Sequence, residues 1–365
     1  MNNSKNLTGA DKIEHMFANN ISFDTNQKYR HEKKIYSRIS INKIYSVYSF
    51  LLKKIYKFVP GIVKDIIFVG WVSHKAPSTR FFAKTKYDEL RTILDIKFSS
   101  LIISAFPLQI KEELRDTFRM GFHETKIQNI SLIDRYIDNV INYSKPSHAG
   151  ARPYFKDGKN QQIEDSFSAY YKFSDEDNKA ICKLINQSLT SDYRYYLSVL
   201  AGYHCEFKDI SFSLGIVFGE NSNSEMHQDT FSGIAKGFIY LQDVDATNSP
   251  FEYLEGSYMD ASFRSNQTNK AVLSEDYYSS GSTRIRNEIL RDAINKFKLK
   301  TFTGPRGTFV LANTSGYHRK GAHQSTKPRI TLNFEIQRKG VFSKLVRNIL
   351  SVIKFKTLRI LKFYK

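Results

Sequence analysis

The sequence predicts an α+β fold in which N-terminal helices buttress an antiparallel β-sandwich or jelly roll. Short strand-like runs begin at Tyr195 and continue to Leu241, with Gly and Asn at the breaks between them. A later run, 327–334, alternates in the manner of a buried strand. Segments with helical periodicity precede these runs and also interrupt them.

The composition is that of a folded protein with a strong positive charge. The 365 residues suffice for one large domain or two smaller ones, and 41% apolar residues can build a full core. The formal net charge of +19 predicts attraction to anions: nucleic acid, an acidic membrane leaflet, or phosphorylated or carrier-linked small molecules. No zinc-finger, RRM or helix-turn-helix signature accompanies the charge, which makes nucleic acid the weakest of these partners.

Residues 1–145 are predicted to form a mostly helical, basic region. Within it, 43–58 carries apolar residues at helical spacing and lysines mostly on the other side. A second helix is predicted over 109–120. Ser131 has the features of an N-cap for a third helix that runs through Ile141. We expect these helices to buttress one outer face of the sheets.

Residues 146–340 are predicted to form the sheet domain. Ser174 marks the start of a helix, because a capping serine precedes three acidic residues in the first turn. The segment 259–300 interrupts the strands; its first half is polar, and 284–297 has helical periodicity. Long ordered excursions are often functional, so we expect a lid or a specificity insert.

The final segment, 341–365, is predicted to be a basic amphipathic helix. Residues 338–365 contain nine Lys and Arg and no Asp or Glu. Two interpretations stay open for this segment and for 43–58. Either the apolar stripe packs on the sheet domain, or it lies on an anionic membrane surface.

Cysteine usage predicts a reducing compartment. Cys182 and Cys205 are far apart in the sequence, and no disulfide is indicated. The first residues lack the apolar core of a signal peptide, and the most apolar run, 58–72, is too short and too charged to span a bilayer. We therefore expect a cytoplasmic protein, which the amphipathic segments could hold on the inner membrane face.

Three residues form a candidate metal site: His227, Asp229 and His318. A His-x-Asp pair followed much later by a single His is the ligand set of a non-haem Fe(II) centre, which leaves positions for O2 and a co-substrate. On a strand, His227 and Asp229 point to one face and Gln228 points away. The third ligand must come from a strand brought back alongside, and His323 competes with His318 for that role.

Arg329 is a candidate for binding the co-substrate. It lies eleven residues after His318, at the start of the predicted buried strand. Its planar guanidinium can hold a carboxylate with two hydrogen bonds, such as the far carboxylate of 2-oxoglutarate. Thr331, two residues on and on the same face, can donate its hydroxyl to that group. The alternative is an ordinary surface arginine on an edge strand.

These residues and the strands around them resemble the phytanoyl-CoA dioxygenase-like branch of the Fe(II)/2-oxoglutarate-dependent oxygenases. The resemblance covers roughly 150–340. The matching segments are 213–218, 226–229, 237–244, 248–251, 255–258, Gly304, 307–311, His318 and Arg329. Glu255 and Tyr258 depart from the family pattern, which usually has Pro and His there. The His-to-Arg interval and the Arg-Lys-Gly that follows favour His318 over His323.

The resemblance implies a double-stranded β-helix, a jelly roll with the metal in its open end. It implies that His227, Asp229 and His318 hold Fe(II) and that Arg329 binds 2-oxoglutarate, which is converted to succinate as a C–H bond of the substrate is oxidised. Related halogenases have Ala or Gly at the carboxylate position, so Asp229 favours hydroxylation, or another oxidation, over chlorination.

The substrate class is open at this point. A cell-envelope glycan or lipid intermediate is our first expectation, and a CoA- or carrier-linked acyl group is the second. Two other functions remain as alternatives. One is a catalytically silent jelly-roll binding module at the membrane surface, and the other is a jelly-roll metal isomerase, which would need more His ligands.

Overall fold

A computed structural model describes most of the chain after residue 91. The described residues are 92–94, 96–106, 108–143, 148–149, 167–189, 192–219, 224–229, 235–272, 283–285, 287–336 and 344–353. The expected amphipathic helix at 43–58 lies outside them, as do parts of 341–365.

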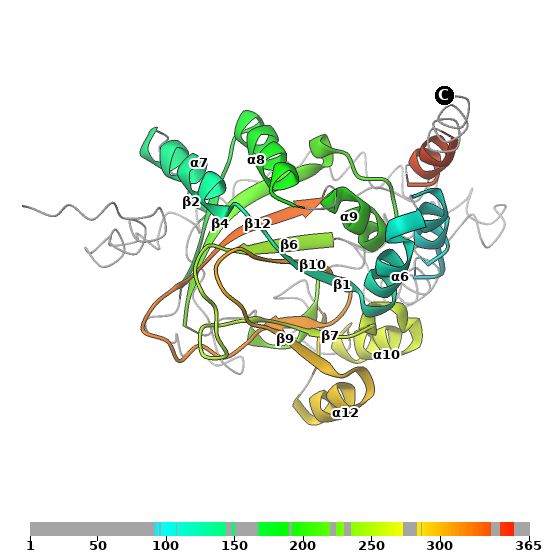
Figure 1. The fold of residues 1–365 in the computed structure, drawn as a ribbon. Coiled ribbons are helices and arrows are strands. Elements are labelled where there is room, and N and C mark those ends of the chain that lie inside the picture. Colours follow the sequence, from blue (N-terminus) through cyan, green and yellow to red (C-terminus); the bar gives the residue numbers. More distant parts are fainter. Residues whose placement is uncertain are drawn as a thin grey trace, which may run out of the picture.

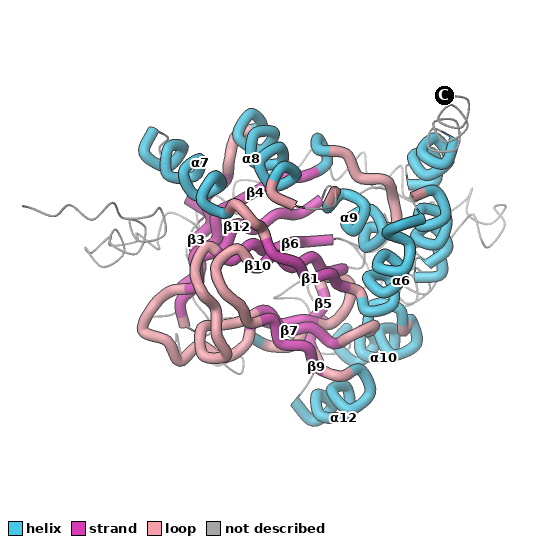
Figure 2. Tube along the Cα trace, viewed as in Figure 1, coloured by secondary structure: helices cyan, strands magenta, loops and turns pink. Residues whose placement is uncertain are grey.

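Two antiparallel sheets form the centre of the molecule (Figures 1 and 2). The larger has seven strands in the order β1 (Phe122–Lys126), β10 (Thr308–Asn313), β6 (Ala235–Tyr240), β12 (Arg329–Ile336), β4 (Ile210–Phe218), β3 (Phe167–Lys172) and β2 (His148–Ala149). The smaller has five strands in the order β8 (Thr283–Arg284), β5 (His227–Gln228), β11 (His318–Lys320), β7 (Phe251–Leu254) and β9 (Leu299–Phe302). The predicted mixture of helices and antiparallel sheet is therefore confirmed.

Helices cover the outer side of each sheet (Figure 1). On the larger sheet these are α7 (Ile130–Tyr143), α8 (Asp175–Gln187) and α9 (Tyr193–Ala201). Beyond the smaller sheet lie α10 (Ala261–Val272) and α12 (Asn287–Phe297). The other helices are α6 (Lys111–Met120) and the short 3-10 helices η1 (Leu108–Ile110), η3 (Phe207–Asp209) and η5 (Ser257–Met259). Residues 96–105 and 344–353 are also helical.

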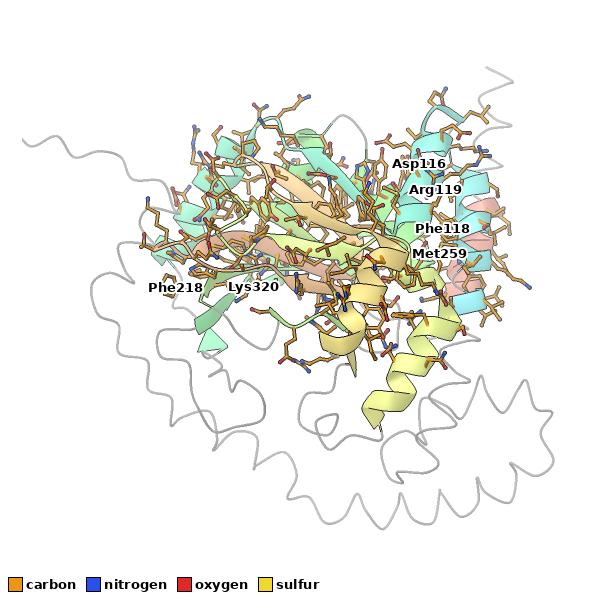
Figure 3. The ribbon with its side chains drawn as sticks, turned by 90° about the horizontal axis from the view of Figure 1, so that it is seen from below. Asp116, Phe118, Arg119, Phe218, Met259 and Lys320 are labelled. Carbon is orange, nitrogen blue, oxygen red and sulfur yellow. The ribbon has the colours of Figure 1, made fainter. Side chains whose placement is uncertain are left out.

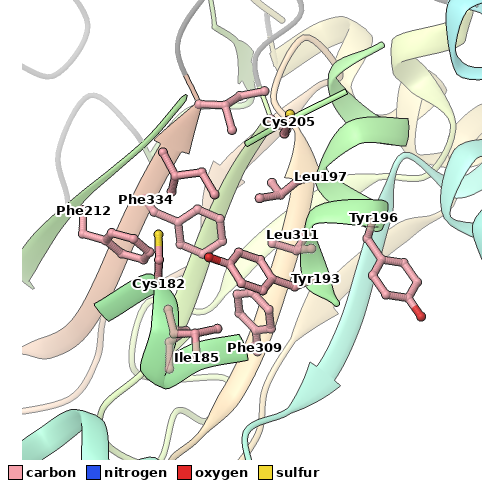
Figure 4. Close-up of a cluster of buried hydrophobic side chains, with 14 of the residues drawn as sticks. Cys182, Ile185, Tyr193, Tyr196, Leu197, Cys205, Phe212, Phe309, Leu311 and Phe334 are labelled. Atoms are coloured by element: carbon pink, nitrogen blue, oxygen red, sulfur yellow. The ribbon is translucent and has the colours of Figure 1, made fainter. Parts of the chain in front are cut away.

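The largest apolar cluster lies between the larger sheet and its helices (Figure 4). On β12 it takes every second residue: Ile330, Leu332, Phe334 and Ile336. Strand residues alternate between faces, so Arg329, Thr331, Asn333 and Glu335 lie on the other face, toward the smaller sheet. β12 therefore contributes polar side chains to the space between the sheets.

A second apolar cluster fills part of the space between the sheets. It joins residues of both: Phe122 of β1 and Val310 of β10 from the larger sheet, and Phe251, Tyr253 and Phe302 from the smaller one. The rings of Phe122 and Phe302 meet edge to face at 4.9 Å between centroids. This aromatic packing holds the two sheets together at one end and leaves the polar side chains of β12 at the other.

Two local predictions are wrong. The run at Tyr195 is not a strand but part of α9, which Asp192 caps by accepting a hydrogen bond from the Arg194 amide. Gly202 ends this helix in the left-handed conformation at φ 71°. Ser131 is not an N-cap, since α7 already begins at Ile130. In both cases the structure is determined by the residues at which the helix begins or ends, and not by the residue type at the predicted position.

Other local predictions are confirmed. Ser174 and Asp177 form a reciprocal capping box at the start of α8. The helical half of the insert corresponds to α12. The division expected at 145–146 stays a prediction; β1, which precedes it, pairs with β10 of the larger sheet. Among the described helices, none is long and apolar enough to cross a bilayer.

Candidate metal centre

Strand pairing brings the three candidate ligands together. His227 on β5 and His318 on β11 are direct partners in the smaller sheet, and their ring centroids are 4.5 Å apart. Asp229 follows β5 and is held by a hydrogen bond from its amide to the carbonyl of Thr314, at 2.9 Å. One ligand atom from each of the three residues lies within 4.8 Å of the others. In the part of the chain that the structure describes, this is the one group of three or more such side chains.

Backbone carbonyls fix the orientation of both imidazoles. Nδ1 of His227 lies 2.7 Å from the carbonyl oxygen of Glu225, and Nδ1 of His318 lies 3.0 Å from that of Gly316. A carbonyl oxygen only accepts, so each Nδ1 carries the proton and each Nε2 presents a lone pair. These Nε2 atoms lie 4.0 and 3.8 Å from the carboxylate oxygens of Asp229. The three residues therefore fit a divalent cation held on one face.

The protonation states suit metal binding. Burial lowers the pKa of His227 to about 3, with the nearby His318 as a further cause, and burial also lowers the pKa of His318. Burial opposes ionisation of Asp229, but the Lys236 ammonium and the two imidazoles hold the pKa of that carboxyl well below its usual range. At neutral pH the site thus has two neutral imidazoles and one carboxylate, the forms that bind metal.

Lys236 of β6 is a neighbour of the site that the sequence did not single out. Its Nζ lies 2.8 Å from Oδ2 of Asp229 and 3.8 Å from Oε2 of Glu335. Ala235 and Ile239 of the same strand belong to the outer cluster. The alternation of β6 therefore turns Lys236 toward the space between the sheets.

Arg329 lies at the start of β12, on the polar face that looks toward the smaller sheet. It is 7% exposed, and its Nη1 donates to the carbonyl oxygen of Ser249. The alternative of an ordinary surface arginine is excluded by this burial. Thr331, on the same face, is 1% exposed, and its hydroxyl donates to Oδ1 of Asn333 at 2.7 Å.

Lys320 is a second buried cation at this end of the sheets. It follows His318 by two residues on β11 and shares its face, and it is 5% exposed. Its Nζ donates to the carbonyl oxygen of Gly219 at 2.6 Å, beside Phe218 at the end of β4 (Figure 3). Arg319, which lies between His318 and Lys320 in the sequence, points to the other face of β11 and pairs with Glu252. The strand period of two could have indicated that Lys320 faces inward.

His323 is not part of the metal group. Its Nδ1 lies 2.8 Å from Oγ of Ser249, and its ring packs against Phe218. The geometry therefore separates His318 from its competitor. His204 is not part of the metal group either; its ring lies near that of Phe106, at 6.4 Å between centroids.

The insert packs behind the metal strand. Arg264 of α10 is 1% exposed and donates from Nε to the side-chain oxygen of Gln228 at 3.1 Å. It also donates to the Tyr258 carbonyl and to the Thr92 hydroxyl. β8, within the insert, pairs with β5 itself. As predicted, Gln228 points away from the ligands, and it connects β5 to the insert.

No family model matches this sequence, and no curated protein does. Solved structures do match. The non-heme alpha-ketoglutarate-dependent epimerase SnoN from nogalamycin biosynthesis is 12% identical, with a TM-score of 0.40 over 64% of this chain and 84% of SnoN. EctD from S. alaskensis, solved with 2-oxoglutarate and 5-hydroxyectoine, is 10% identical, with a TM-score of 0.39 over 64% and 77% of the two chains. The carbocyclase SnoK is 14% identical, with a TM-score of 0.35 over 62% and 83%. With likenesses this distant, the function has to be inferred from the residues of the site.

Proposed function

We propose that this protein is an Fe(II)- and 2-oxoglutarate-dependent dioxygenase that hydroxylates a C–H bond of a small anionic substrate. The observation that carries the proposal is the convergence of His227, Asp229 and His318, with both imidazoles oriented by backbone carbonyls. Two imidazoles and one carboxylate on one face are the ligand set of non-haem iron oxygenases. We further propose that the two sheets form the jelly roll of the phytanoyl-CoA dioxygenase-like family.

The protein residues would bind and orient while the metal carries the oxidation. Bound Fe(II), together with O2 and 2-oxoglutarate, supplies the oxidising power for an unactivated C–H bond. His227, Asp229 and His318 would hold the iron. The carbonyl oxygens of Glu225 and Gly316 fix the tautomer of both imidazoles, so the lone pairs stay directed at one point.

The 2-oxoglutarate site is assigned to the end of the sheets where Arg329 and Lys320 lie. Both side chains are buried cations, and guanidinium and ammonium groups are the donors that pair with the carboxylates of a dianionic co-substrate. Arg329 would bind the far carboxylate with its planar fork, and Thr331 on the same face would add a hydroxyl donor. Lys320 would be a further binding residue of this site, one that the family resemblance did not indicate.

The substrate would lie beside the metal group, with the aromatic cluster as one wall. The Phe251 ring is 5.7 Å from that of His318 and 4.8 Å from that of Phe238, so an apolar wall borders the ligands. Lys236 adds a positive charge beside Asp229. An anionic molecule with an apolar part suits these surroundings. A cell-envelope glycan or lipid intermediate remains our first candidate and a CoA- or carrier-linked acyl group our second.

The test is oxygen-dependent turnover of 2-oxoglutarate. Protein reconstituted with Fe(II) is expected to form succinate from 2-oxoglutarate, and candidate substrates of the two classes are expected to accelerate it. His318→Ala should remove this activity. Substrate-dependent succinate formation that persists in His318→Ala would overturn the proposal, and a wild type without any succinate formation would favour the silent binding module.

A further inference from the structure

The last described helix, 344–353, docks on the domain through its polar side. Nζ of Lys344 donates to the Ala201 carbonyl at 2.9 Å, and Nη1 of Arg347 pairs with Oδ2 of Asp209 at 2.5 Å. Asn348 is fully buried and bonds to the backbone of His204 and of Gly202, at 3.1 and 3.0 Å. Three polar residues at helical spacing thus hold this helix to the segment between α9 and η3.

The apolar residues of the same helix face away from the domain. These are Leu345, Val346, Ile349, Leu350 and Ile353, with exposed fractions of 38, 39, 46, 61 and 57%. On a helix of 3.6 residues per turn, they fall within one stripe opposite Lys344, Arg347 and Asn348. An amphipathic surface helix normally presents its apolar stripe to the core. Here the arrangement is reversed, and Figure 1 shows the helix at the edge of the molecule, beyond α6.

The sequence around this stripe is strongly basic. Residues 338–365 contain nine Lys and Arg and no acidic residue, and only two of the nine, Lys344 and Arg347, lie in the described helix, where they are used for docking. The others precede and follow the apolar stripe in the sequence. An exposed apolar stripe flanked by cations fits the boundary between acyl chains and anionic headgroups.

We propose that the face formed by Leu345, Val346, Ile349, Leu350 and Ile353 binds an anionic lipid surface. The apolar side chains enter the headgroup region, and the basic residues on either side contact the lipid phosphates. The protein is thereby held at the bilayer through this helix. This inference is independent of the proposed oxidation, because none of these residues contacts the metal group.

Vesicle co-sedimentation of the full chain tests this inference. We expect binding to vesicles of equal parts phosphatidylcholine and phosphatidylglycerol, and little binding to phosphatidylcholine alone. The double variant Ile349→Ser/Leu350→Ser should lower the partition coefficient about tenfold or more, since both side chains are exposed and their replacement leaves the fold intact. Leu132→Ser on α7, at the opposite side of the molecule in Figure 1, is the control and should bind as wild type.

A second variant measures the electrostatic contribution to vesicle binding. Lys354→Gln/Lys356→Gln/Lys362→Gln removes three charges and should weaken binding to the anionic vesicles by about 100-fold, with a smaller salt dependence. The proposal is overturned if wild type ignores anionic vesicles or if the Ile349/Leu350 variant binds as well as wild type. It is also overturned if sedimentation equilibrium shows a dimer that this variant dissociates, since a second copy would then cover the face.

Discussion

His227 and His318 lie directly opposite each other on neighbouring antiparallel strands, with ring centroids 4.5 Å apart. The entire insert lies between them in the chain. Each imidazole is fixed through Nδ1 by a carbonyl two residues before it, at Glu225 and at Gly316. The two strands therefore present the same local arrangement to one point, and Asp229 completes it.

Removing one imidazole should remove tight metal binding. His318→Ala is expected to weaken the binding of Fe(II), or of Mn(II) as a substitute, by more than about 100-fold, because loss of a mere supporting residue already costs 10- to 100-fold. Anaerobic titration calorimetry measures this. The matched control is His323→Ala. The His323 side chain is hydrogen-bonded to Ser249 and does not contact the ligands, so this variant should keep the metal affinity of wild type. Equal affinities for His318→Ala and wild type would contradict the assignment.

Removing the buried guanidinium should weaken the co-substrate and spare the metal. Arg329→Met is expected to raise the dissociation constant of 2-oxoglutarate by about 10- to 100-fold, the effect of losing a charge-assisted bidentate contact. Fe(II) affinity should stay near that of wild type. Arg319→Met removes the same charge from the outward face of β11, where it pairs with Glu252, and serves as the control. If both variants weaken 2-oxoglutarate equally, general electrostatics and not a specific clamp is responsible.

Acid should destabilise the fold through His123. Burial lowers the pKa of His123 to about 4, against 6.5 for the free side chain, with Glu113 opposing the shift. Between these values the unfolded chain binds the proton and the folded one does not, so stability falls as pH drops from about 6.5 to about 4. The full effect is about 3 kcal/mol.

His123→Phe isolates this contribution. The new ring can keep the stack on Tyr196, where the two rings are now 3.8 Å apart and inclined by 9°. Urea unfolding at pH 7 and at pH 4.5 should show a smaller difference in free energy of unfolding for the variant than for wild type. The same difference in both proteins would show that His123 is protonated in the folded state.

A cavity behind the polar face of β12 should cost stability. Leu332 is fully buried in the cluster between the larger sheet and its helices. Leu332→Ala is expected to lower the free energy of unfolding by about 2–5 kcal/mol in denaturant titrations. Leu350→Ala, at a position 61% exposed, should change it by less than about 0.5 kcal/mol. A cost as large for Leu350 as for Leu332 would mean that the exposed stripe is covered within the protein.

The positions of the ligands could be predicted from the sequence because chemistry and strand period point to the same residues. His227 and Asp229 share a face, Gln228 takes the other, and the alternation of β12 places Arg329 and Thr331 together. The burial of the side chains around them could not be predicted. The strand period places Lys320 on the face of His318, but only the pairing of β11 with β5 and β7 shows that Lys320 is buried.

The structure also differs from the local sequence pattern in two helices, because residues outside the pattern determine how each one forms or docks. The residues 193–201 include three tyrosines and Val199, which favour strands, but the cap at Asp192 and the left-handed Gly202 define a helix instead. In the C-terminal helix the pattern defined two faces and could not tell which face docks. Buried hydrogen bonds of Asn348 decide it for the polar face.

The most direct test of the account is an anaerobic titration of the Fe(II)-loaded protein with 2-oxoglutarate, followed by visible difference spectroscopy. The account predicts a weak charge-transfer band that saturates at one 2-oxoglutarate per chain, is absent in His318→Ala, and needs far more 2-oxoglutarate in Arg329→Met. Wild-type protein that binds no stoichiometric Fe(II), or that binds it and gives no band with 2-oxoglutarate, would contradict it.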